Sequence, residues 1–119
     1  MKKKILVCDD EESIRLLLAE ALQDIYEITE AADGHEAVKH VTKDPPDLVI
    51  MDIKMAGTHG LEAIERIRER NNEIPIIVCS AYRLMQDDMV VKTSDIAAFI
   101  TKPVDINDLR KKIATILGM

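Results

Sequence analysis

The sequence predicts a single α/β domain built on a parallel β-sheet. Short apolar runs alternate with segments in which apolar residues recur at helical spacing, a pattern typical of consecutive βα units. The clearest runs are 5–8, 48–51, 76–79 and 97–100. They are continuous rather than alternating, as expected of strands that helices cover on both faces. A length of 119 residues suits one domain over residues 1–119, with room for a sizeable core.

The first half of the chain contains two strand–helix units. After the run at 5–8, the one-sided spacing of a helix is formed by Ile14, Leu17, Leu18, Ala21 and Leu22. Residues 26–31 alternate between polar and apolar side chains, which indicates a half-exposed edge strand. Asp33 and Glu36 have the spacing of a capping box, so we expect a second helix to begin there.

The second half contributes three more units. The helix after the third strand has an apolar stripe made of Leu61, Ile64 and Ile67. Residues 83–93 have less regular apolar spacing, so we expect some of their apolar side chains to be exposed. Asp105 and Asp108 indicate the start of the last helix. Its stripe consists of Leu109, Ile113, Ile116 and Leu117.

Composition narrows the classes of function. The formal net charge is −6 and no basic stripe is visible, so direct nucleic-acid binding is not expected. No apolar stretch approaches the roughly 20 residues of a membrane span. The basic start, residues 1–4, precedes an apolar run too short for a signal peptide, so we expect a cytoplasmic protein. Cys8 and Cys79 lie inside apolar runs, where cysteine usually behaves as a small buried hydrophobe.

Polar and charged side chains end four of the predicted strands. They are Asp9 and Asp10 after the first run, Asp52 after the run at 48–51, Ser80 after 76–79 and Lys102 after the last run. Right-handed crossovers place every loop that follows a strand at the same edge of a parallel sheet. Ligands of open α/β sheets bind at this edge. The sequence therefore predicts one site that contains all five residues.

The residue types at this edge suit phosphoryl chemistry with a metal ion. Three carboxylates repel one another unless a cation joins them, and Mg²⁺ takes a few carboxylates together with phosphate oxygens. One carboxylate can act as a nucleophile and form an aspartyl-phosphate. Lys102 and Ser80 offer a cation and a hydroxyl to the phosphoryl oxygens. Each residue alone has a common structural explanation, such as capping a helix. Only their joint placement favours the functional interpretation.

These motifs resemble the receiver domain of two-component response regulators, and the resemblance covers essentially the whole chain. The matching residues are Asp9-Asp10, the segment 52–55 followed by Gly60, Ser80-Ala81, and the segment 99–103. The resemblance implies a flavodoxin-like (βα)5 doubly wound sandwich with a five-stranded parallel sheet in the order 2-1-3-4-5. It also implies a signalling domain, here of the single-domain type, and not an enzyme beyond its own phosphotransfer and autodephosphorylation.

The resemblance assigns roles to the residues of the site. It implies that Asp52 is the phosphoacceptor, which receives a phosphoryl group from a phosphohistidine on a sensor histidine kinase or a histidine phosphotransfer protein. Asp10 and Asp52 would ligate Mg²⁺ directly, together with the backbone carbonyl of Lys54, and Asp9 would act through water. Mn²⁺ or Ca²⁺ is expected to substitute for Mg²⁺.

Further roles follow from the same resemblance. Lys102 and Ser80 would hold the phosphoryl oxygens, and Ser80 with Phe99 would form the conformational switch. The Lys102–Pro103 peptide bond is expected to be cis. The chain departs from the family pattern where Ala56 replaces a common proline, Ser80 a common threonine, and residues 95–97 a usual Gly-Ala turn. None of these changes removes a group that the reaction requires.

Other functions stay open at this point. The chain could be a phosphorelay intermediate that passes phosphate to another histidine protein. A less favoured alternative is an Mg²⁺ phosphatase with an aspartate nucleophile, resembling the haloacid-dehalogenase group. Those enzymes need an acid two residues after the nucleophile, where this chain has Lys54. A flavin or nucleotide module would need glycines or hydroxyls, instead of acids, at the first βα turn. A degenerate receiver used only for docking would not need the complete acid set.

The output of the domain is not encoded in these motifs. No output domain follows the last predicted helix, so we expect either a stand-alone regulator or a fragment of a longer one, as a monomer or weak dimer. Its output partner is unknown. We expect docking through the face made by residues 83–93, the last strand and the last helix. Met85, Met89 and Val90 are candidates for an apolar patch on that face.

Overall fold

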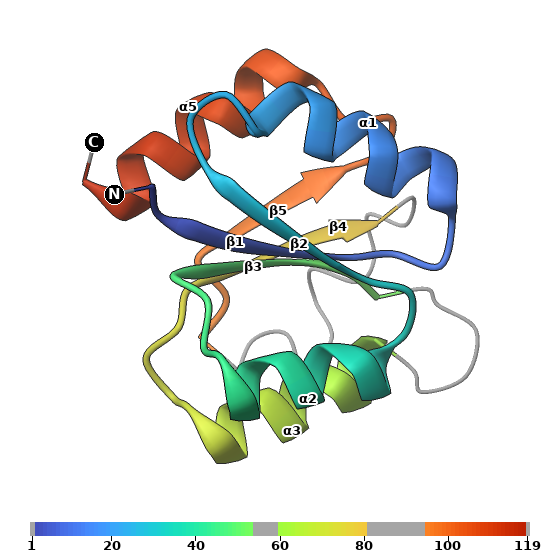
Figure 1. Cartoon of the computed structure of the whole chain (residues 1–119), viewed down its shortest axis with the longest axis vertical. Coiled ribbons are helices and arrows are strands. Elements are labelled where there is room, and N and C mark those ends of the chain that lie inside the picture. Colours follow the sequence, from blue (N-terminus) through green and yellow to red (C-terminus); the bar gives the residue numbers. More distant parts are fainter. Residues whose placement is uncertain (1, 54–59, 81–94, 119) are drawn as a thin grey trace.

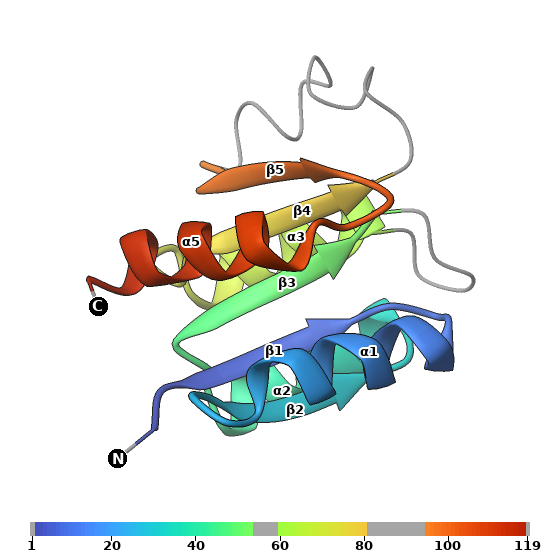
Figure 2. The same ribbon diagram turned by 90° about the horizontal axis from the view of Figure 1, so that it is seen from above.

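The computed structural model describes residues 2–53, 60–80 and 95–118. Five parallel strands form one sheet in the order β2-β1-β3-β4-β5, which confirms the predicted fold (Figures 1 and 2). The strands are β1 (Lys4–Cys8), β2 (Glu27–Ala31), β3 (Leu48–Asp52), β4 (Ile76–Ser80) and β5 (Ala98–Thr101). The helices are α1 (Glu12–Leu22), α2 (Gly34–Lys43), α3 (Gly60–Arg70) and α5 (Ile106–Leu117). The segment 83–93 lies outside the described residues.

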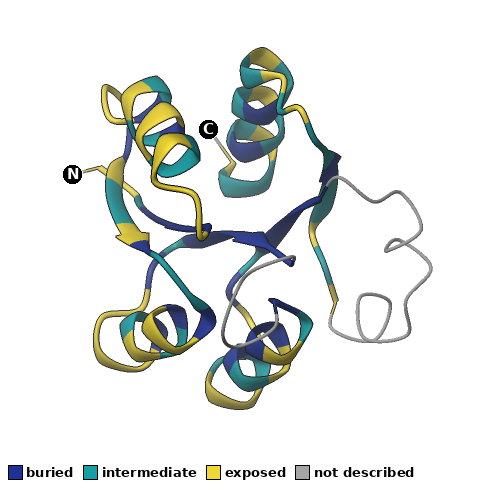
Figure 3. Ribbon diagram, turned by 90° about the vertical axis from the view of Figure 1, so that its right-hand side faces the viewer, coloured by how far each residue is buried: buried dark blue, intermediate teal, exposed yellow. Residues whose placement is uncertain are grey.

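The helices cover the sheet in two layers. In Figure 1, α1 and α5 lie on one face and α2 and α3 on the other. Side chains of each strand alternate between two apolar clusters. In β1, Ile5 and Val7 pack with Leu18 of α1 on one face, while Leu6 packs with Ile64 of α3 on the other. The continuous apolar runs of the sequence thus correspond to strands that are buried on both sides (Figure 3).

The edge strand and the helix starts agree with the sequence patterns. Glu27 and Glu30 of β2 are exposed, as expected of a strand at the edge of the sheet. The Asp33 side chain accepts a hydrogen bond from the amide of Glu36 at 2.9 Å. The Glu36 carboxylate reaches back to the amide of Ala32 at 2.7 Å, one residue before the cap. This capping box stabilises the start of α2.

Helix α5 begins at the residues that the sequence indicates. The Asp105 side chain accepts from the amide of Asp108 at 3.1 Å. Leu109 and Ile113 are buried against the sheet, and the remaining stripe residues are partly buried. At the other end, Gly118 adopts a left-handed conformation with φ of 74°, which favours glycine.

The predicted stripe of α1 is wrong at one position. Leu17 has 48% of its surface exposed, whereas Leu18 is 2% exposed. At 100° per residue, Ile14, Leu18, Ala21 and Leu22 fall within an arc of about 100°, and Leu17 lies beyond its edge. The buried face of α1 is therefore narrower than the five-residue stripe that the sequence predicts. Leu16 is equally exposed at 48%, so α1 presents two leucines to solvent.

Gly60 allows α3 to begin directly against the end of β3. A Cβ atom at this position would lie 2.1 Å from the Cα of Ile53 and 2.7 Å from the carbonyl oxygen of Asp52. Only glycine fits so close to another backbone. Among the described residues, no helix combines the length and apolar character that crossing a bilayer requires.

Candidate functional site

Four strand ends bring the predicted site residues to one edge of the sheet. Asp52 and Ser80 are the last residues of β3 and β4, while Asp9 and Lys102 directly follow β1 and β5. The parallel register keeps these ends level, and all strands point toward this edge in Figure 2. These four residues therefore lie together at the edge of the sheet where the sequence predicts them.

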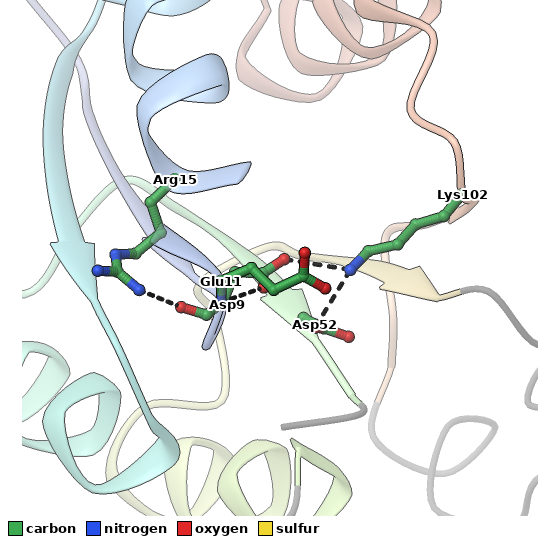
Figure 4. A network of polar contacts seen from close by, with 5 residues as sticks. All are labelled: Asp9, Glu11, Arg15, Asp52 and Lys102. Atoms are coloured by element: carbon green, nitrogen blue, oxygen red, sulfur yellow. Dashed lines mark hydrogen bonds and ion pairs between the residues drawn. The ribbon is translucent and has the colours of Figure 1, made fainter. Parts of the chain in front are cut away.

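Lys102 bridges two buried carboxylates at the centre of the site (Figure 4). Its Nζ lies 3.2 Å from Oδ2 of Asp9 and 3.2 Å from Oδ2 of Asp52. Both aspartates are 3% exposed. Burial of Lys102 by itself would lower its pKa, but attraction to Asp52 and Asp9 and the hydrogen bonds to both outweigh burial, so the pKa is raised. The ammonium group is therefore a fixed positive charge between the two acids.

Asp10 adds a third carboxylate to this pair. One oxygen each of Asp9, Asp10 and Asp52 lies within 4.8 Å of the others, and Asp10 is exposed. We call these three residues the acid cluster. Three carboxylates and the Lys102 ammonium leave a formal charge of −2. An all-oxygen donor set with this charge, open to solvent at Asp10, fits a hard divalent cation such as Mg²⁺.

Asp9 is held by hydrogen bonds at each of its polar groups. Its amide donates to the carbonyl of Ala31 at 3.1 Å, and its carbonyl accepts from Nη1 of Arg15 at 2.7 Å. Oδ1 accepts from the amide of Glu11 at 3.0 Å, and Oδ2 accepts from Lys102. Asp9 is thus a fixed part of the turn between β1 and α1 (Figure 4).

Sequence reasoning missed Arg15. This residue lies in the first turns of α1, six positions after Asp9, and the apolar pattern of the helix gives no indication of where it points. Its Nε also donates to Oε1 of Glu30 on β2 at 3.2 Å. The one signal in the sequence was a cation near the start of a helix, where the helix dipole disfavours positive charge.

Ser80 and Phe99 occupy different environments. Ser80 is fully buried, and its carbonyl accepts from the amide of Lys102 at 2.8 Å. This bond fixes the end of β5 against β4. Phe99 is half-buried and packs against the cluster under α2 and α3. The Lys102–Pro103 peptide bond is cis, as the resemblance implies. Lys54 and Ala56 lie outside the described residues.

The two cysteines are buried, which confirms the expectation from their apolar surroundings. Burial raises the pKa of Cys79 to about 12, although the nearby Lys102 ammonium acts in the opposite direction. Burial, with the charge of Asp33 next in importance, also raises the pKa of Cys8. Both groups are therefore protonated thiols that pack in the core.

Comparison with known proteins agrees with this geometry. The sequence model of the response regulator receiver domain matches residues 5–114. The chain belongs to the response regulator receiver domain family. Receiver domains are the signalling switches of two-component systems, and they interact with histidine kinases or phosphotransfer proteins.

Several relatives consist of little more than a receiver domain. The chain is 35% identical to Sporulation initiation phosphotransferase F of Bacillus subtilis, over 100% of this chain and 97% of the relative. It is 37% identical to Chemotaxis protein CheY of Halobacterium salinarum, over 98% of each. Other curated relatives are longer, and this receiver spans about half the length of the transcriptional regulators it matches.

A solved structure has the same fold, and its sequence identity is close to that of these two relatives. The response regulator TrrA of Thermotoga maritima, crystallised in complex with Mg²⁺-BeF, superposes with a TM-score of 0.88 at 38% identity. The alignment covers 98% of this receiver and 99% of TrrA.

Proposed function

We propose that this receiver takes a phosphoryl group from a phosphohistidine onto Asp52, with Mg²⁺, and changes its docking surface in response. The observation that carries the proposal is the Lys102 ammonium, which lies 3.2 Å from a carboxylate oxygen of both Asp9 and Asp52, beside a third, exposed carboxylate. Such a site offers a nucleophile, an oxygen donor set and a fixed cation within one small volume.

The position of Asp52 supports its role as the nucleophile. It ends the central strand of the sheet, between β1 and β4, with Ser80 at the end of β4 and Lys102 directly after β5. Both carboxylate oxygens of Asp9 accept hydrogen bonds that fix the β1–α1 turn. A carboxylate with both oxygens so engaged is poorly placed to attack.

In the proposed step, an oxygen of Asp52 attacks the phosphorus atom of the phosphohistidine. The new O–P bond forms as the N–P bond breaks, and the departing imidazole nitrogen takes its proton from solvent. Lys102 and the hydroxyl of Ser80 bind the phosphoryl oxygens as charge builds on them. Mg²⁺, held by Asp10, Asp52 and the carbonyl of Lys54, with Asp9 acting through water, would neutralise the phosphoryl charge. Hydrolysis of the acyl phosphate resets the receiver.

The proposed function also includes the resident ion, the cellular location and the conformational switch. The Mg²⁺ in the TrrA complex supports Mg²⁺ as the resident ion, and Mn²⁺ and Ca²⁺ would substitute because both accept carboxylate oxygens. We place the protein in the cytoplasm, with a sensor histidine kinase or histidine phosphotransfer protein as phosphodonor. Ser80 and Phe99 would relay phosphorylation to the surface.

A phosphorelay intermediate is the second candidate function. It is favoured by the similarity to a sporulation phosphotransferase over nearly the full length of both chains. Phosphate on Asp52 would then pass to a histidine of another protein. Incubation of the phosphorylated receiver with candidate histidine phosphotransfer proteins distinguishes the two, because only a relay member loses its phosphate as the partner gains it.

The proposed chemistry can be tested by intact mass. Incubation with acetyl phosphate and Mg²⁺ should add one phosphoryl group to the parent chain. Asp52→Asn should remain unmodified, and so should the parent after the metal is chelated. Asp24→Asn is the matched control, because Asp24 is an exposed aspartate outside the acid cluster, and it should gain the group as the parent does. Labelling of Asp52→Asn, or none of the parent, would overturn the assignment.

A further inference from the structure

Arg15 links three parts of the fold beside the acid cluster. It belongs to α1, its Nη1 donates to the Asp9 carbonyl at 2.7 Å, and its Nε donates to Glu30 on β2 at 3.2 Å. The Arg15 side chain is 16% exposed and that of Glu30 is 38% exposed. The guanidinium therefore joins the end of β1, the start of α1 and the edge strand. Figure 4 shows its contact with Asp9.

The location of Arg15 is unfavourable unless these contacts compensate for it. A cation in the first turns of a helix faces the positive end of the helix dipole. Burial also lowers the mobility of a long side chain, which opposes folding. The planar guanidinium can donate to the carbonyl and the carboxylate together, which a lysine ammonium does less well. The contact to Asp9 is therefore specific.

The carbonyl that Arg15 binds belongs to the peptide unit between Asp9 and Asp10. A peptide unit is planar, so fixing its carbonyl also fixes the amide of Asp10. The direction of the backbone at Asp10 is thereby fixed as well. The amide of Asp9 is held from the other side by Ala31. The orientation of both carboxylates thus depends on this one peptide plane.

We infer that Arg15, oriented by Glu30, is a positioning residue that sets the affinity of the acid cluster for Mg²⁺. It acts through the Asp9–Asp10 peptide. This inference rests on the metal site of the proposed function. Groups that orient ligands from behind typically contribute about 10- to 100-fold to metal affinity.

Titration with Mg²⁺ alone, followed by amide chemical shifts of the isotope-labelled full chain, tests the inference. Arg15→Ala should weaken Mg²⁺ binding about 10-fold. Glu30→Gln, which keeps an acceptor but loses the charge, should weaken it about 3-fold, because the charge-assisted bond becomes an ordinary one. The matched control is Arg66→Ala on α3, which removes an exposed arginine paired with Glu62 at 2.8 Å and should leave the affinity unchanged.

Phosphorylation kinetics separate positioning from a general structural effect. In Arg15→Ala, the Mg²⁺ concentration for half-maximal labelling by acetyl phosphate should rise about 10-fold, while the rate at saturating Mg²⁺ stays within about 2-fold of the parent. Equal Mg²⁺ affinity in Arg15→Ala and Arg66→Ala overturns the inference. If Arg15→Ala does not fold by circular dichroism, Arg15→Lys decides in its place, and parental affinity in that variant overturns the inference.

The two proposals fail in distinguishable ways. A parent chain that binds Mg²⁺ but is not phosphorylated contradicts the proposed function, and the titration still decides the role of Arg15. A parent chain that binds no Mg²⁺ overturns both.

Discussion

The ammonium group of Lys102 decides the charge balance of the acid cluster. It contacts two aspartates that are each 3% exposed, so their charges are shielded from water but not from one another. With Lys102 in place the cluster has a formal charge of −2, which a divalent cation neutralises. Phosphorylation of Asp52 would add negative charge beside the same ammonium. In the proposed function, the same lysine would therefore contact the site of both the metal and the phosphoryl group.

Replacement of this lysine should reduce stability in a pH-dependent way. Lys102→Met should lower the free energy of unfolding by about 2 kcal/mol at neutral pH, because two buried carboxylates lose their shared cation. The folded pKa of Lys102 is raised, so its contribution is fully present below the ordinary lysine pKa of about 10.4 and is lost as the pH rises through the folded pKa.

Urea denaturation at pH values from about 7 to about 11 measures this effect. The difference between parent and Lys102→Met should be constant up to about pH 10 and then shrink. Lys112→Met is the matched control, since Lys112 forms a more exposed pair with Asp108 at 2.6 Å on one helix face. That variant should lose no more than about 0.5 kcal/mol. A difference in the free energy of unfolding between the parent and Lys102→Met that grows above about pH 10 would contradict this expectation.

The secondary-structure elements position the site through their ends. Four of the five strands carry a predicted site residue at their last position or directly after it, and α3 begins against Asp52 and Ile53 because Gly60 has no side chain. At the other end of the sheet, Arg68 of α3 donates to the carbonyls of Ile74 and Asp95, which ties α3 to the segments that lead into β4 and β5. Helix α3 is therefore fixed at both of its ends, one beside the site and one at the opposite edge of the sheet.

The rotation of α1 about its own axis can be tested with two neighbouring leucines. Leu18→Ala should lower the free energy of unfolding by about 2–4 kcal/mol, because the side chain is 2% exposed and leaves a cavity. Leu17→Ala should change it by no more than about 0.5 kcal/mol, because Leu17 is 48% exposed. Chemical denaturation of both variants provides the comparison, and equal losses would show that α1 is rotated from the position described.

At the scale of the whole molecule, most of the fold and the centre of the site could be predicted from sequence. Continuous apolar runs identify strands buried on both faces, and the handedness of crossovers then brings Asp9, Asp52, Ser80 and Lys102 to one edge. The contacts of Arg15 and the exposure of Leu17 could not be predicted in the same way. Both depend on how α1 is rotated against the sheet, which is set by packing between elements distant in sequence.

The residue that carries the phosphoryl group can be identified chemically. The receiver would be phosphorylated with acetyl phosphate and Mg²⁺, reduced with borohydride, and digested for peptide mass analysis. Borohydride reduces an aspartyl-phosphate to homoserine, so we expect homoserine at position 52 and unmodified aspartate at positions 9 and 10. Homoserine at position 9 or 10, or phosphate that survives reduction on another type of residue, would contradict it.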